Sequence, residues 1–126
     1  MSQLVFNAKD QAIICRAEVF GKNHSLTLKM IVDTGSTYTI VPKNVLSVLG
    51  KFRIDRIVEI TTGSGIERVQ LITVPTFKAL GFAVHHFPLI IHDLPPRSPI
   101  EGLLGLNFLK KAKVIIDFQR NRITLS

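Results

Sequence analysis

The chain of 126 residues has the length of a single domain, which we expect to span residues 1–126 and to bury roughly two-thirds of its unfolded surface. Apolar residues make up 46% of the composition and charged residues 20%, which favours a compact fold and excludes a disordered chain. The formal charge of +7 comes without a nucleic-acid-binding motif, so we expect a solvated basic face and no nucleic-acid partner.

The N-terminal segment carries no recognisable targeting signal. Residues 1–10 lack a basic start followed by an apolar stretch, which is the pattern of a signal peptide. The longest apolar runs, such as residues 87–91, are far shorter than the roughly 20 residues of a membrane-spanning helix. We therefore expect a cytoplasmic protein with no membrane partner. Cys15, the only cysteine, lies in an apolar run, and we interpret it as a buried structural thiol.

Most of the chain consists of short alternating or β-branched runs separated by turn residues, a pattern typical of an all-β sandwich or barrel. In residues 25–32, polar and apolar residues alternate, which predicts a strand with one polar and one apolar face. Gly21-Lys22-Asn23 is expected to join the first two strands as a hairpin turn. The expected strands, in chain order, span residues 11–20, 25–32, 39–41, 52–60, 66–80 and 82–92.

Two short helices and a closing hairpin complete the expected elements. Residues 42–49 begin with a proline and stop before Gly50, as helices commonly do. Residues 106–111 are long enough for one or two helical turns. Residues 113–125 contain β-branched runs on either side of Gln119-Arg120-Asn121, which predicts a hairpin. We therefore expect an all-β fold with one or two short helices.

The strongest local signal is an apolar strand that runs directly into Asp33-Thr34-Gly35-Ser36. Such residues are common at strand ends, where an Asp can simply hydrogen-bond its own turn. Further along the chain, Gly102-Leu103-Leu104-Gly105 precedes the second expected helix. Between these elements, Thr61-Thr62-Gly63-Ser64-Gly65 forms the tip of a long expected hairpin, although two glycines at a hairpin tip need no further function.

Together these elements resemble the retropepsin group of aspartic proteases, across roughly residues 11–125. The resemblance implies a small closed β-barrel-like fold and an aspartic endopeptidase whose flap is the hairpin tip. It also implies that Leu103-Leu104-Gly105 packs behind the Asp33 loop. It gives catalytic roles to Asp33, Thr34 and Gly35. It gives substrate-binding roles to Ser36, Thr62, Gly63 and Ser64.

The resemblance further implies how the loop residues would act. Thr34 would hydrogen-bond across a two-fold axis, and Gly35 would let the backbone approach the substrate or the water closely. Ser36, where several viral enzymes carry Ala, would donate a hydrogen bond to the Asp33 carboxylate or accept one from it. The apolar residues proposed to line substrate pockets are Ile60, Ile66, Leu71 and Ile100.

The chemistry of peptide hydrolysis explains why one such loop is insufficient. One group must deprotonate the attacking water and another must protonate the departing nitrogen. Two carboxylates about 3 Å apart can share one proton and divide these roles. No acid other than Asp33 is followed by Thr-Gly or Ser-Gly. We therefore expect a homodimer acting on peptides or proteins, and no cofactor is implied because water is the nucleophile.

Other functions remain open from the sequence. A catalytically silent dimerisation or peptide-binding module could keep the fold and an intact Asp33 loop without assembling an active pair of acids. A basic protein associated with RNA or DNA is a third possibility. A metal site is not expected, because His85 and His86 are neighbours on a strand and would face opposite sides of a sheet.

Overall fold

The computed structural model describes residues 2–7, 9–10, 12–50 and 52–126. Gln11, with which the first expected strand begins, lies outside the described residues. No helix in the described ranges is long and apolar enough to cross a membrane. The strands are β1 (Ser2–Val5), β2 (Ile14–Phe20), β3 (Ser25–Val32), β4 (Ile40–Val41), β5 (Ile54–Thr62), β6 (Gly65–Ala79), β7 (Phe82–Ile91), β8 (Gly102–Leu104), β9 (Val114–Asp117) and β10 (Arg122–Leu125), and the helices are α1 (Asn44–Leu49) and α2 (Leu106–Leu109).

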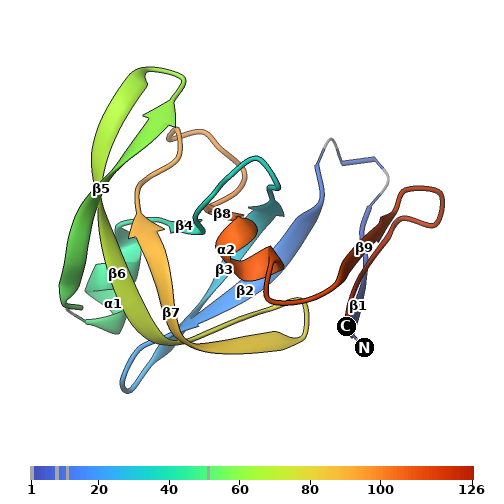
Figure 1. Ribbon diagram of the computed structural model, residues 1–126, viewed down its shortest axis with the longest axis horizontal. Coiled ribbons are helices and arrows are strands. Elements are labelled where there is room, and N and C mark those ends of the chain that lie inside the picture. Colours follow the sequence, from blue (N-terminus) through green and yellow to red (C-terminus); the bar gives the residue numbers. More distant parts are fainter. Residues whose placement is uncertain (1, 8, 11, 51) are drawn as a thin grey trace.

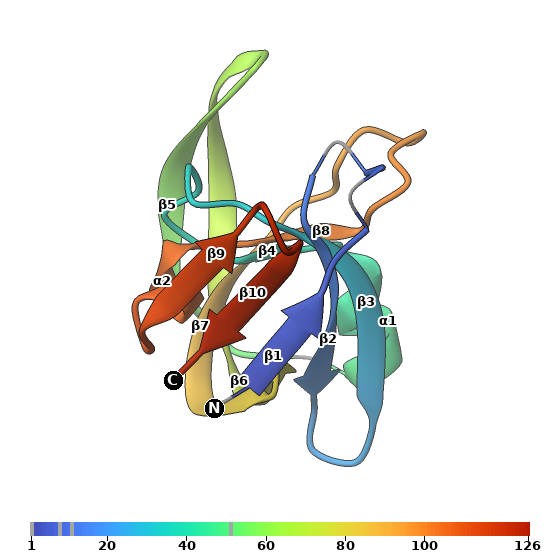
Figure 2. The same cartoon turned by 90° about the vertical axis from the view of Figure 1, so that its right-hand side faces the viewer.

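Six strands close into a barrel in the order β2-β3-β8-β4-β7-β6, because β6 pairs with both β7 and β2. Among the described strands β5 pairs only with β6, so the β5–β6 hairpin extends beyond the barrel (Figure 1). A second sheet has the order β1-β10-β9 and joins the first strand to the last two (Figure 2). This architecture confirms the expected all-β, barrel-like fold with short helices.

Apolar side chains fill the interior of the barrel. Leu28 and Met30 point inward from β3 and are fully buried, as the alternation in that strand predicts. The rings of Phe77 and Phe87 stack with centroids 4.8 Å apart, and Phe108 packs edge-on against both. Because Phe108 belongs to α2, this aromatic cluster anchors the helix to the barrel.

Local patterns located the elements well but not always their ends. β3 has the expected bounds, α1 begins at Asn44 rather than at the preceding proline, and Gly50 ends it with a φ of 97°. Two strands were not expected. β1 owes its place to pairing with β10 at the other end of the chain, with Ser2 opposite Leu125. β8 is three residues long and is held by parallel pairing with β3.

Candidate active site

Asp33 follows β3 directly and begins the loop that leads to β4. Val32 pairs with Leu104 of β8, and the Asp33 backbone N–H donates to the Leu104 carbonyl oxygen at 2.9 Å. The chain then turns, with the Ser36 N–H donating to the Asp33 carbonyl oxygen at 3.2 Å. The Gly35 N–H donates to the Asp33 carboxylate at 2.9 Å. The half-buried carboxylate is thus oriented by its own turn, at the end of a strand fixed in the barrel.

Two glycines allow the loop to lie directly against β8 and α2. A Cβ added to Gly105 would collide with the carbonyl group of Tyr38, and one added to Gly102 would collide with the carbonyl oxygen of Ile40. Side chains are therefore excluded at both positions. Gly105 packs behind the Asp33 loop, as the resemblance implied.

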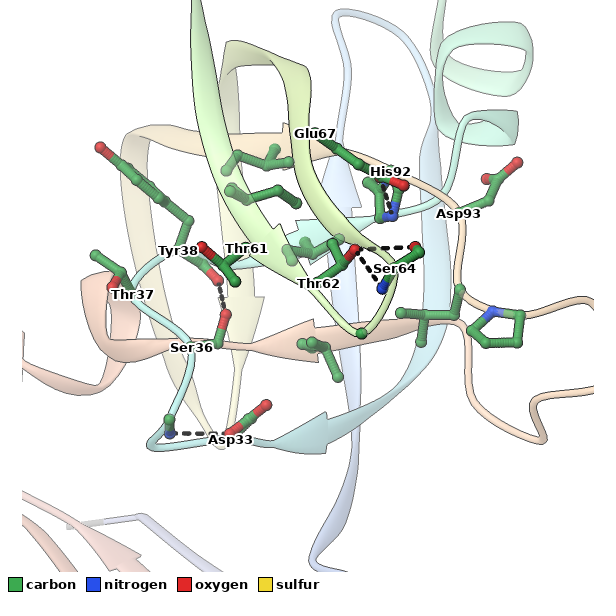
Figure 3. A pocket seen from close by; sticks show the side chains of 18 of the residues that line it. Asp33, Ser36, Thr37, Tyr38, Thr61, Thr62, Ser64, Glu67, His92 and Asp93 are labelled. Carbon is green, nitrogen blue, oxygen red and sulfur yellow. Dashed lines mark hydrogen bonds and ion pairs between the residues drawn. The ribbon is translucent and has the colours of Figure 1, made fainter.

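A cleft of about 940 Å³ opens between the Asp33 loop and the tip of the β5–β6 hairpin. Figure 3 shows Asp33 on one side of this cleft and the hairpin tip, with Thr62 and Ser64, on the other. Of the residues to which the resemblance gives catalytic or substrate-binding roles, those that line this cleft are Asp33, Gly35, Ser36, Thr62, Gly63 and Ser64. Thr34 is exposed and is not among the lining residues. The fold therefore brings the Asp33 loop and the hairpin tip together, although they are distant in the chain. The resemblance had assigned residues of both segments to substrate binding.

One expected contact and most of the expected pocket residues differ in the structure. The Ser36 hydroxyl donates to the Tyr38 carbonyl oxygen at 2.7 Å rather than bonding to the Asp33 carboxylate, because the turn brings that carbonyl within its reach. Of the apolar candidates, Ile60 lines the cleft, whereas Leu71 and Ile100 are buried elsewhere. Ile66 is 71% exposed and is not a lining residue, since alternation along β6 turns the neighbouring Glu67 toward the cleft instead.

The cleft also contains charged residues that sequence reasoning did not identify. The Glu67 carboxylate lies 3.3 Å from the His92 ring at one end of the cleft, where Asp93 also lies (Figure 3). Asp93 accepts the Lys43 backbone N–H at 2.8 Å. With Asp33 and Glu59, four carboxylates line the cleft, and none of its described lining residues is Lys or Arg. Nothing local in the sequence marks these residues, because strands far apart in the chain assemble them.

The opposite end of the cleft carries Tyr38. Its hydroxyl accepts a hydrogen bond from the Arg56 guanidinium of β5 at 3.4 Å.

Away from the cleft, the ring of His85 on β7 shares a hydrogen bond of 3.0 Å with the Thr76 hydroxyl. Among the described residues, no group of three or more His, Cys, Asp or Glu side chains is placed to hold a metal ion.

Comparison with known proteins places this arrangement in a family. The family model described as gag-polyprotein putative aspartyl protease matches residues 21–111, which include the Asp33 loop, the hairpin tip and Gly105. The chain belongs to this family. Among the solved structures similar to this family member is the crystal structure of a retropepsin-like aspartic protease from Rickettsia conorii.

That match has a TM-score of 0.66 and 22% sequence identity, and it covers 98% of this chain and 87% of the Rickettsia chain. At this identity the likeness shows a shared fold, which is the retropepsin fold. No curated protein sequence gave a significant match to the chain.

Proposed function

We propose that the chain is an aspartic endopeptidase that works as a homodimer, with water activated between the Asp33 carboxylates of two copies. The observation that carries this proposal is the cleft in which Asp33 faces the hairpin tip. Membership of an aspartyl protease family supports it as well. The chain offers only one Asp-Thr-Gly, so the second carboxylate is assigned to a partner copy.

In the proposed dimer, the two Asp33 carboxylates share one proton. The ionised carboxylate takes a proton from water as the oxygen attacks the peptide carbonyl carbon, and the protonated one supplies the proton that reaches the leaving nitrogen. The peptide lies extended between the loop and the hairpin, as an added strand in contact with Ser36 and the tip. Thr34 is assigned to the contact between the two loops, because it is exposed and does not line its own cleft.

Digestion of a peptide library by wild type and by Asp33→Asn tests the catalytic assignment. An amide cannot act as the general base, so the variant should fold and associate like wild type but lose peptidase activity. Asp10→Asn is the matched control, because Asp10 is exposed and lies outside the cleft. Wild-type turnover by Asp33→Asn would show that the carboxylate is not required.

Subunit mixing tests the dimer separately from the chemistry. If chains exchange and pair at random, adding an equal amount of Asp33→Asn chain should lower wild-type activity by roughly half, through inactive heterodimers. Undiminished activity after verified exchange would mean that one chain suffices. Ultracentrifugation showing an inactive monomer at high concentration would favour a silent peptide-binding module instead.

The pH profile supplies a third test. A pair of carboxylates that shares one proton is active only in the singly protonated state, so kcat/KM should be bell-shaped with its maximum at mildly acidic pH. Activity that rises steadily into the alkaline range would contradict the proposed mechanism.

A further inference from the structure

Thr39, at the end of the Asp33 loop, is the only fully buried polar residue in the described part of the chain. Its N–H and its hydroxyl both donate to the Asn107 side-chain oxygen, each at 2.8 Å. The hydroxyl oxygen also accepts the Gly105 N–H at 3.1 Å, and the Thr39 carbonyl oxygen accepts the Ile90 N–H at 2.9 Å. Every polar group of Thr39 is therefore bonded.

Asn107 joins this residue to two other elements. Its side-chain NH₂ donates to the Pro88 carbonyl oxygen of β7 at 2.8 Å, while its backbone N–H donates to the Thr37 carbonyl oxygen at 3.1 Å. The neighbouring Leu106 N–H donates to the Ser36 carbonyl oxygen at 2.8 Å. One amide thus links the loop, α2 and β7, using its acceptor and its donor at the same time.

We propose that Asn107 is a positioning residue, which sets the location of Asp33 by holding the loop through Thr39. The inference rests on the proposed function, because Asp33 must meet its symmetry mate within about 3 Å. The first residue of the loop is bonded to Leu104 and its last part to Asn107, while Thr34 and Gly35 between them are exposed. Asn107 does not line the cleft and acts only through other residues.

The substitution Asn107→Asp separates this role from general packing. Asp has the shape of Asn, but its ionised carboxylate presents an oxygen to the Pro88 carbonyl oxygen where a donor now lies. When protonated, the acid regains a donor. Neither Thr39 nor Pro88, the bonded partners of the side chain, titrates. The loss of kcat should therefore be largest at a pH where the introduced carboxylate is ionised, and it should diminish as the pH falls.

The first experiment measures kcat and KM per folded dimer from about pH 4 to about pH 8, with the folded fraction followed by circular dichroism under assay conditions. We expect kcat of Asn107→Asp to be roughly ten- to a hundredfold below wild type at neutral pH and to approach it at acidic pH, with a smaller change in KM. Asn23→Asp, an exposed turn substitution with the same charge change, should follow wild type throughout. A ratio of kcat values that does not vary with pH would overturn the proposal.

Variants of Thr39 cover the case in which Asn107→Asp does not fold. Thr39→Ser keeps the hydroxyl that bonds Asn107 and Gly105, so it should retain nearly the wild-type kcat. Thr39→Val removes that hydroxyl and should lower kcat roughly tenfold or more in the folded dimer. Equal kcat values for the two variants would count against a positioning role.

A second experiment does not depend on activity. Amide hydrogen exchange should show that Asn107→Asp opens the N–H groups of Thr39 and Gly105 at neutral pH, while the amides of β2 keep their protection. Unchanged exchange at both positions would overturn the proposal even in an active enzyme. If wild type cleaves no peptide, the proposed function fails, but the exchange data still decide whether Asn107 holds the loop.

Discussion

At Gly105 the lack of a side chain lets the Asp33 loop lie against α2. The Tyr38 carbonyl group occupies the position that a Cβ would need, and the Ser36 hydroxyl bonds the same carbonyl oxygen from within the loop. Moving the loop away would break the bonds that the Leu106 and Asn107 N–H groups of α2 donate to the Ser36 and Thr37 carbonyl oxygens. A change at this one position tests how firmly the loop is held.

We predict that Gly105→Ala lowers the free energy of unfolding by about 2–4 kcal/mol, because the loop or α2 must shift to admit the methyl group. Denaturation by urea measures the loss. Gly63→Ala is the matched control, since a Cβ there meets nothing within 4 Å, and it should change stability by less than about 1 kcal/mol. Equal losses in both variants would show that close packing at Gly105 is unimportant.

Cys15 provides a pH-dependent test at the same scale. The side chain is 4% exposed, and its burial raises the pKa of the thiol from 9.0 to about 11. The unfolded chain therefore loses this proton at lower pH than the folded chain does. The free energy of unfolding should fall by about 2–3 kcal/mol as the pH rises from about 9 toward 11.

The comparison that isolates this effect is the pH dependence of unfolding in wild type and in Cys15→Ala. The variant should lack this part of the alkaline decrease, although its stability is lower overall because a buried sulfur is lost. The native thiol should also resist alkylation at about pH 8 until the protein unfolds. Identical alkaline slopes in the two proteins would contradict the prediction.

Among the secondary-structure elements, the β5–β6 hairpin is distinctive because it extends beyond the barrel. β5 has a single strand partner among the described residues, and most of its residues are exposed. β2, in contrast, pairs with both β3 and β6 inside the barrel. Because fewer contacts oppose local opening of β5 than of β2, the hairpin tip should move relative to the cleft more readily than the barrel strands do.

We predict that amides near the hairpin tip, around residues 60–66, exchange roughly a hundredfold or more faster than those of β2. Hydrogen exchange measured by NMR checks this. A statine-type peptide inhibitor should then slow exchange at the tip and leave β2 unchanged, because the proposed peptide site lies between the hairpin and the Asp33 loop. Uniform protection of both elements without inhibitor would mean that the hairpin is as rigid as the barrel.

At the scale of the whole molecule, the charge of the cleft opposes that of the chain. The chain carries a formal charge of +7, yet its cleft is lined by four carboxylates and its described lining residues include no Lys or Arg. The cleft should therefore have a negative electrostatic potential, although the protein as a whole is basic. Peptides with basic side chains should be attracted to it more strongly than acidic ones.

We predict that kcat/KM is higher for a peptide carrying Lys beside the cleaved bond than for the same peptide carrying Glu, by roughly tenfold at low ionic strength. The difference should shrink in high salt, where charges are screened. Glu67→Gln should also reduce it, whereas Glu18→Gln, on β2 and outside the cleft, should not. A preference for the acidic peptide would contradict this view of the cleft.

Much of the fold and part of the candidate site could be predicted from local sequence patterns. The alternation in residues 25–32 predicted β3 with its observed bounds, and the placement of Asp33 at its end followed directly. Glycines at the expected turn located the hairpin tip, and all the residues to which the resemblance gave catalytic or substrate-binding roles, except Thr34, line the cleft. These features are local because strand alternation and turn conformation depend on neighbouring residues.

The remaining features depend on contacts between segments that are distant in the chain. β1 is a strand because β10 pairs with it, and Glu67 meets His92 because β6 and β7 are neighbours in the barrel. The bonds of Asn107 to Thr39 and Pro88 likewise exist only once α2 packs behind the loop. No periodicity or turn motif encodes such pairings, since each side chain finds its partner through the folded arrangement of the backbone. Tertiary structure alone therefore decided the charge of the cleft and the support of the Asp33 loop.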